Sequence, residues 1–282
     1  MQIEKAAEMG FCFGVRRAIE IVEKAAGERG PLQTLGALVH NQQVVDRLAD
    51  RGVTVAQTPD DIETPVVAVT SHGVSPRTLE TLRASGHEII DATCPFVRKA
   101  QVAAERLAEA GFWVHVFGDS DHPEVKGLLG WAGARSSAST GLPPSDDLGK
   151  KLGVVCQTTQ SPEAFARFLS QLAPRQLSRL SELRVVNTIC DATRRNQEAA
   201  VELSGRVQAM VVIGGRDSAN TKRLAELCTA TGTPTYRVET AGDLSTDWFR
   251  GMSVVGVTAG ASTPDDVVEE VVRSLSALPG GS

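Results

Sequence analysis

The sequence contains no apolar run long enough to cross a lipid bilayer, which takes about 20 residues. Its first stretch, MQIEKAAEMG, carries charges where a signal peptide needs an apolar segment. We therefore expect a cytoplasmic protein without membrane contact. Because that compartment is reducing, structural disulfides are disfavoured, and the five cysteines are expected as thiols or as metal ligands.

The chain also has little of what nucleic-acid binding requires. Its formal net charge is −5, so no excess of basic residues is present to hold a phosphate backbone. Aromatic residues make up only 4%, which argues against a platform for stacked bases. The sequence contains no Walker loop and no dinucleotide fingerprint. We therefore expect neither a nucleic acid nor a bound nucleotide as partner.

What the sequence does contain is an alternation of short Val- and Ile-rich runs with amphipathic helical patterns. Such an alternation is typical of parallel sheets covered by helices, so we predict the α/β fold class. The strand-like runs are VVAV (66–69), VHVF (114–117), VVIG (211–214) and VVGVT (254–258).

Three of the cysteines, Cys12, Cys94 and Cys190, have matching surroundings. Each has arginine four residues later and a second basic residue at the fifth position, where a helical pattern begins. A polar residue follows 28 residues after each cysteine, in a predicted loop between strand and helix: His40, His122 and Ser218. Each segment then has a strand, a polar loop and a proline-started helix, for which we predict the N-caps Ser75, Ser161 and Thr263.

These matches predict an internal threefold repeat of roughly 90 residues. The predicted domains are 1–93, 94–189 and 190–282, the last with a C-terminal tail. Three similar α/β units can pack around a pseudo-threefold axis as a trefoil. In that arrangement the three cysteines meet near the axis, each at a strand-to-helix turn where the helix N-terminus favours a thiolate.

Three thiolates at one point need a cation. Zinc is one candidate, but it usually takes a fourth ligand. A 4Fe-4S cluster fits better, because three cysteines hold three irons and leave the fourth iron open for water or substrate. The alternative is that all three cysteines are buried core residues. We favour the cluster because the cysteines are in register.

The loops at the predicted carboxyl ends of the strands are rich in neutral donors and poor in acids. In open α/β sheets ligands bind at these ends, and such a set of donors suits a phosphorylated anion. The loops carry His40, Asn41, His72, His122, Thr158, Thr159, Ser218, Asn220 and Ser262. Glu124 is the exception among them. It is either an ordinary first-turn glutamate or a proton relay, and its neighbours favour the relay.

These residues resemble the LytB family of 4-hydroxy-3-methylbut-2-enyl diphosphate reductases. The resemblance runs from about Gly10 to about Val272. It is carried by the motifs GFCFGV, LVHN, SHGVSP, DATCPFV, HPEV, QTTQS, NTICDAT, SANTKRL and VTAGAS. The family's fold is three α/β units in a trefoil around an iron–sulfur cluster.

The resemblance also assigns roles to residues. It implies that Cys12, Cys94 and Cys190 hold a 4Fe-4S cluster, which an oxygen-exposed sample is prone to degrade to 3Fe-4S or to lose. It implies catalytic roles for Glu124, Thr158 and His122. It implies substrate binding by His40, His72, His122, Thr158, Ser218, Asn220 and Ser262. Ala219 departs from the serine that we associate with some members of the family.

The implied reaction is the last step of the methylerythritol phosphate route to isoprenoids. The 4-hydroxyl group of (E)-4-hydroxy-3-methylbut-2-enyl diphosphate binds the open iron and leaves as water, giving isopentenyl and dimethylallyl diphosphate. The electron donor is expected to be a ferredoxin or a flavodoxin. Two rival hypotheses are a non-redox hydratase or dehydratase, which would turn over without an electron donor, and an iron or redox sensor, which would not need the phosphate-binding loops or Glu124.

Overall fold

The computed structural model of the chain describes residues 1–143 and 148–278. Contacts divide them into two compact units. The first contains Met1–Arg16, Val39–Asp46 and the chain from Asp191 onward; the second contains Arg17–Leu38 and Arg47–Cys190. The end of the predicted C-terminal tail, 279–282, lies outside the described residues. Among these residues no helix is long and apolar enough to span a membrane.

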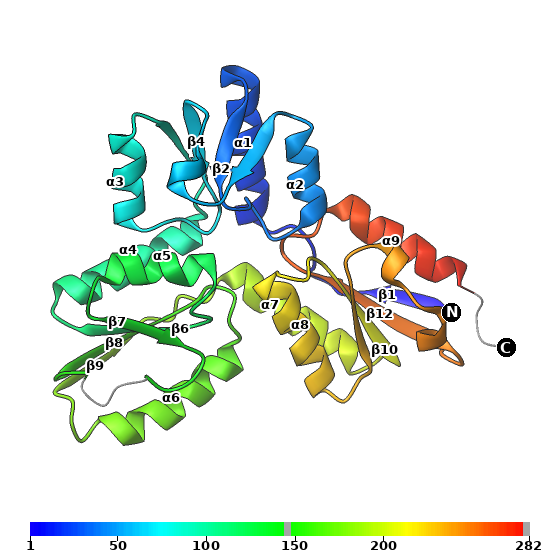
Figure 1. Cartoon of the computed structure of the whole chain (residues 1–282). Helices are drawn as coiled ribbons and strands as arrows, with labels where there is room; N and C mark the ends of the chain where they lie inside the picture. Colours follow the sequence, from blue (N-terminus) through cyan, green and yellow to red (C-terminus); the bar gives the residue numbers. More distant parts are fainter. Residues whose placement is uncertain (144–147, 279–282) are drawn as a thin grey trace. The chain divides into compact units, whose positions relative to one another are not determined.

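Strands and helices alternate along the chain, as the sequence predicts (Figure 1). The strands are β1 (Gln2–Lys5), β2 (Leu32–Leu35), β3 (Val53–Ala56), β4 (Val66–Val69), β5 (Glu88–Asp91), β6 (Trp113–Phe117), β7 (Ser136–Ser139), β8 (Lys151–Cys156), β9 (Glu182–Val185), β10 (Ala209–Ile213), β11 (Thr235–Val238) and β12 (Val254–Ala259). The helices are α1 (Phe13–Arg29), α2 (Gln42–Ala49), α3 (Pro76–Ala84), α4 (Pro95–Glu109), α5 (Pro123–Ala132), α6 (Pro162–Gln176), α7 (Asp191–Ser204), α8 (Ala219–Ala230) and α9 (Asp265–Ala277). Short 3-10 helices are η1 (Pro59–Asp61), η2 (Ala241–Asp243) and η3 (Thr246–Phe249).

The strands form three four-stranded sheets, and the described pairings are all parallel. The first sheet has the order β3-β2-β4-β5 and the second the order β7-β6-β8-β9, both in the second compact unit. The third sheet, β1-β12-β10-β11, lies in the first compact unit. The predicted α/β class with three similar units of parallel sheet is confirmed.

Each cysteine of the repeat follows an edge strand, which is β5 for Cys94, β9 for Cys190 and β1 for Cys12. β5 and β9 follow the other strands of their own sheet along the chain. β1 instead comes from the opposite end of the chain and pairs with β12 from Gln2↔Val254 to Lys5↔Val257. The repeats along the sequence and the sheets in space therefore differ by one strand. The domain boundaries 1–93, 94–189 and 190–282 stay a prediction.

Helices cover both faces of the second and third sheets, which is why the central strands β6, β8, β10 and β12 are mostly apolar and are buried beyond their first residues. In the second sheet, α4 and α5 pack on one face and α6 on the other (Figure 1). In the third sheet, α7 and α8 pack on one face and α9 on the other. All five residues of β10 are buried. Cys156 and Cys228 are fully buried among apolar side chains and belong to the core.

Local capping explains where several helices begin. The hydroxyl groups of Ser75 and Ser161 accept hydrogen bonds of 3.1 Å from the backbone N–H groups of Thr78 and Ala164. These two predicted N-caps are confirmed. The third prediction is wrong, because the hydroxyl of Thr263 donates to the carbonyl oxygen of Ile213 at 3.1 Å. α9 therefore begins one residue later, with Pro264 as its N-cap.

Candidate functional site

The three repeat cysteines occupy the same backbone position in their respective parts of the fold. Each is the last residue before a helix, namely α1, α4 and α7. Each donates its backbone N–H to the carbonyl oxygen of the residue two positions beyond the end of the neighbouring strand. These bonds are Cys12 to Ala261 at 3.1 Å, Cys94 to Ser71 at 3.0 Å and Cys190 to Thr158 at 3.0 Å. The predicted strand-to-helix turns are therefore present at all three positions.

These turns suit metal ligation. Cys12 and Cys94 are half-buried, and Cys190 is buried with 9% of its surface exposed. Helix N-termini favour anionic ligands such as thiolates. The three cysteines share one backbone position, directly before a helix. Cys156 and Cys228 do not share it, because they lie inside a strand and inside a helix.

Glu124 lies in the first turn of α5 and is almost completely buried. Its two carboxyl oxygens accept hydrogen bonds from Thr158: one of 2.6 Å from the backbone N–H and one of 2.8 Å from the hydroxyl. Burial raises the pKa of Glu124 from 4.5 to about 7, against the opposing effect of both Thr158 hydrogen bonds. The carboxyl can therefore hold or release a proton near neutral pH.

Two histidines accompany this carboxyl within the second compact unit. His122 is the N-cap of α5, and its Nδ1 accepts a 3.2 Å hydrogen bond from the backbone N–H of Glu124. In the neutral ring the proton then lies on Nε2, which becomes a donor. The ring of His72, from the loop after β4, meets the ring of His122 edge-on with 5.3 Å between centroids.

In the first compact unit, three buried polar side chains lie beyond the carboxyl ends of β10 and β12, two at the start of α8 and one in the loop after β12. Ser218 is the N-cap of α8 and accepts a 3.3 Å hydrogen bond from the backbone N–H of Thr221. Asn220 and Ser262 are only 4% and 8% exposed. Both amide atoms of Asn220 and the hydroxyl of Ser262 make no hydrogen bond within the described residues. Unpaired buried polar groups are costly, so these atoms indicate a polar ligand.

His40 approaches the same loops. The glycine at position 215 is required here, because a Cβ would collide with the carbonyl oxygen of His40. The pKa of the His40 ring is lowered mainly by burial; nearby Asp217 opposes this shift and Lys222 adds to it. A neutral imidazole of this kind can serve as a hydrogen-bond donor to an anion.

The structure divides the predicted site residues between the two compact units. The second unit contains Cys94, Cys190, His72, His122, Glu124 and Thr158. The first unit contains Cys12, His40, Ser218, Asn220 and Ser262. Within each unit these residues lie on loops, or in the first helical turn after a loop, beyond the carboxyl ends of strands.

Sequence reasoning missed the surroundings of the cysteine turns. Arg98, four residues after Cys94, donates to Asp91 at 2.6 Å and to the side chain of Gln101 at 2.8 Å. The equivalent arginines, Arg16 and Arg194, also form ion pairs with carboxylates of their own unit. The common offset of four residues was the only signal for these contacts in the sequence.

Comparisons with known proteins agree with this architecture. Residues 3–276 match the LytB protein family. The chain is 50% identical to the 4-hydroxy-3-methylbut-2-enyl diphosphate reductase of Dehalococcoides mccartyi strain CBDB1, over 100% of both chains. It is 45% identical to the protein of the same name from Geobacter sulfurreducens, over 98% of this chain and 97% of that one.

Two solved structures are also similar. One is a structure of (E)-4-hydroxy-3-methyl-but-2-enyl diphosphate reductase, described as the terminal enzyme of the non-mevalonate pathway. It is 37% identical, covers 98% of this chain and 99% of its own, and has a TM-score of 0.69. The other is the structure of E-1-hydroxy-2-methyl-but-2-enyl-4-diphosphate reductase from Plasmodium falciparum. It is 26% identical, covers 99% of this chain and 89% of its own, and has a TM-score of 0.91.

The three parallel sheets, their cysteine turns and these relatives together define an oxidoreductase of the α/β class. Within that class the match over residues 3–276 and the identity of up to 50% settle the family. The chain belongs to the LytB protein family.

Proposed function

We propose that the chain catalyses the reductive dehydroxylation of (E)-4-hydroxy-3-methylbut-2-enyl diphosphate, the last step of the methylerythritol phosphate pathway. The products are isopentenyl diphosphate and dimethylallyl diphosphate. The observation that carries the proposal is the buried Glu124–Thr158 pair, because the backbone carbonyl of Thr158 also accepts the N–H of Cys190. Thr158 therefore contacts both the titratable carboxyl of Glu124 and the candidate cofactor ligand Cys190.

An iron–sulfur cofactor fits the cysteine turns. Three equivalent thiols at three helix N-termini match a cluster held by three thiolates, whereas a structural zinc site would want four ligands. We propose that Cys12, Cys94 and Cys190 hold a 4Fe-4S cluster with one open iron. When bound, such a cluster supplies single electrons and a Lewis-acid iron.

The diphosphate group is proposed to bind the neutral donors. The amide nitrogen of Asn220 and the hydroxyl of Ser262 would donate hydrogen bonds to phosphate oxygens, which removes the cost of burying these two groups unpaired. Ser218, His40 and His72 add further donors. These donors would hold the diphosphate by hydrogen bonds. Holding the substrate in one orientation lowers the entropic part of the activation barrier of the reaction.

The proton chemistry is proposed for Glu124, with Thr158 and His122. Removal of the hydroxyl group as water consumes two electrons and two protons per substrate. A carboxyl group with a pKa of about 7 can release a proton at neutral pH and be reprotonated between turnovers. Thr158 holds both carboxyl oxygens in place, and His122 caps the helix turn that carries Glu124.

The electrons are proposed to come singly from a carrier of the ferredoxin or flavodoxin type, in the cytoplasm. The test is anaerobic purification with iron and sulfide analysis, followed by turnover of the diphosphate substrate with and without a reduced one-electron donor. Donor-dependent formation of both products, with about four irons per chain, supports the proposal. Turnover without any donor would instead support a hydratase or dehydratase, and a chain that takes up no iron or sulfide would contradict the cluster.

A further inference from the structure

The loop that leads to Ser218, residues 214–217, begins with two glycines, which have no side chains to hold its backbone in place. It begins at Gly214 and Gly215, directly after β10, and glycine has the largest conformational freedom to lose on ordering. The neighbouring edge strand β11 ends opposite, with Ile213 aligned to Val238. The loop between β10 and α8 and the segment after β11 therefore lie side by side at the carboxyl ends of the two strands.

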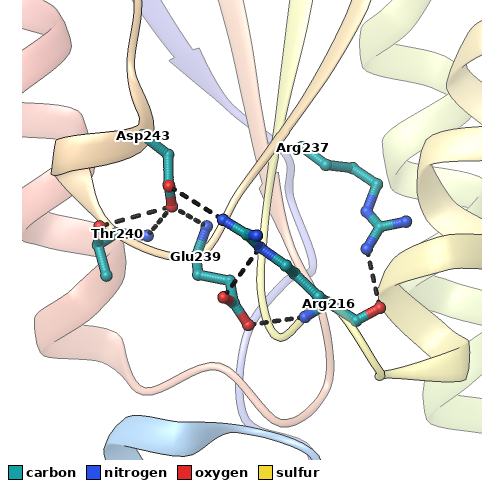
Figure 2. A network of polar contacts seen from close by, with 5 residues as sticks. All are labelled: Arg216, Arg237, Glu239, Thr240 and Asp243. Atoms are coloured by element: carbon teal, nitrogen blue, oxygen red, sulfur yellow. Dashed lines mark hydrogen bonds and ion pairs between the residues drawn. The ribbon is translucent and has the colours of Figure 1, made fainter.

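Arg216 joins these two segments through its backbone (Figure 2). Its N–H donates to the carboxylate of Glu239 at 2.7 Å. Its carbonyl oxygen accepts a 2.9 Å hydrogen bond from the guanidinium of Arg237. Both polar groups of this loop residue are thus held by side chains from β11 and the residue after it.

The side chain of Arg216 makes a second set of contacts. It forms ion pairs of 3.2 Å with Glu239 and of 3.4 Å with Asp243. Asp243 in turn accepts backbone N–H groups from Thr240 at 3.0 Å and Glu239 at 2.9 Å, and these bonds lower its pKa. The five residues form a closed network, which we call the Arg216 network: Arg216, Arg237, Glu239, Thr240 and Asp243.

We infer that Glu239, Arg237 and Asp243 are positioning residues for the diphosphate-binding turn, acting through Arg216 on Ser218 and Asn220. This inference rests on the proposed function. Ser218, the N-cap of α8, lies two residues after Arg216. A displacement of the loop backbone therefore moves the hydroxyl of Ser218 and the amide of Asn220 together. The residues of the network are not among the predicted catalytic residues.

The expected effect of a Glu239 substitution on KM depends on how exposed its contacts with Arg216 are to solvent. The side chains of Arg216 and Glu239 are 74% and 33% exposed, so the ion pair itself contributes little. The hydrogen bond from the Arg216 N–H to a carboxylate contributes more, since one partner is charged. We expect Glu239→Ala to raise the KM for the diphosphate substrate about fivefold to tenfold, with kcat within about twofold.

Glu239→Gln serves as the conservative variant. Its amide oxygen still accepts the Arg216 N–H but forms no ion pair, so it should recover most of the wild-type KM. Arg237→Met removes the other backbone contact and should also raise KM. Asp247→Ala is the matched control, because it breaks an exposed ion pair with Arg250 in the same unit, outside the network. It should leave KM unchanged.

Binding of inorganic pyrophosphate, measured by calorimetry on the holoenzyme, separates this inference from the proposed function. Weaker binding in Ser218→Ala, Glu239→Ala and Arg237→Met, but not in Asp247→Ala, would support it. Weaker binding in Ser218→Ala with wild-type binding in Glu239→Ala and Arg237→Met would overturn this inference alone. If Ser218→Ala and Asn220→Ala both bind as the wild type does, the diphosphate site and this inference fail together.

Discussion

The loops around Glu124 and the loops around Asn220 are both buried and polar, but they differ in what they lack. Glu124 has both carboxyl oxygens occupied by Thr158. Asn220 and Ser262 have polar atoms without any partner among the described residues. The Glu124 carboxyl is therefore paired without a ligand, and its pKa of about 7 lets it hold a proton near neutral pH. In the second region, the proposed diphosphate would supply the hydrogen-bond partners that Asn220 Nδ2 and the Ser262 hydroxyl lack.

This difference separates two kinds of functional residue. A group that performs proton chemistry needs an environment that sets its pKa before the substrate arrives. A group that recognises the substrate gains most if its donors are kept desolvated and unpaired until binding. Substitutions that remove these polar groups should therefore affect the stability of the fold in opposite directions in the two regions.

The largest effect is expected for Cys94→Ser, which removes a proposed cluster ligand. We expect iron and sulfide content to fall sharply and turnover to drop at least about 10³-fold, since residues acting as one unit fail together. Pyrophosphate binding by the loops around Asn220 should persist. Cys228→Ala, in the core of the other unit, is the control and should keep its iron. A Cys94→Ser protein with full iron content would rule out Cys94 as a ligand.

The next effect is expected for Glu124→Gln, which keeps the shape of the side chain but not its proton. We expect kcat to fall by about 10² to 10⁴ while iron content and KM change little. In the wild type kcat should fall as pH rises through about 7, because the protonated carboxyl is the donor. The variant should lose this inflection. Full activity in the variant would contradict the proton-relay role.

The same residue has a signature in stability. Its folded-state pKa of about 7 lies above the ordinary 4.5, so the native state binds the proton more tightly than the unfolded state does. Stability should therefore fall as pH rises from about 4.5 to about 7, and Glu124→Gln should flatten this slope. Thermal unfolding at a series of pH values measures it. Parallel pH profiles for wild type and variant would show that burial does not shift this pKa.

The sequence predicted those parts of the site that depend on neighbours along the chain. The cysteine turns, the helix starts at Pro76 and Pro162, and the loop positions of His122 and Ser218 follow from local signals of proline, serine and strand pattern. The sequence did not predict contacts between segments that are far apart along the chain. Nothing near Gln2–Lys5 says that this strand pairs with β12, because strand partners are chosen by the whole sheet.

Hydrogen bonds to distant residues explain the other features that the sequence did not predict. Thr263 has the sequence of an N-cap, but its hydroxyl bonds to Ile213 from a different strand. The backbone contact between Thr158 and Cys190 and the Arg216 network likewise join residues that are more than 20 positions apart. Such bonds depend on folded geometry and leave no periodic pattern in the sequence.

A pair of hydroxyl deletions tests the contrast between the two regions directly. Thr158→Val removes a donor to the buried Glu124 carboxyl and should destabilise the protein by about 1–3 kcal/mol. Ser262→Ala removes a hydroxyl that has no hydrogen-bond partner among the described residues, so stability should be unchanged or slightly higher, while KM for the diphosphate substrate rises. Denaturant unfolding and steady-state kinetics give the two values. If both variants lower the free energy of unfolding equally, the proposed difference between the two regions is wrong.

The smallest effect is expected for Ala219→Ser, at the first residue of α8. Ala219 stands beside Ser218 and is half-buried, so a new hydroxyl would add one donor to the region that already has unpaired donors. One added neutral hydrogen bond corresponds to a KM about twofold to fivefold lower. Ala230→Ser, at the other end of the same helix, controls for the lower helix propensity of serine and should leave KM unchanged. An unchanged KM in Ala219→Ser would mean that this position faces away from the diphosphate, and the recognition loops would then be limited to the buried side chains of Ser218, Asn220 and Ser262.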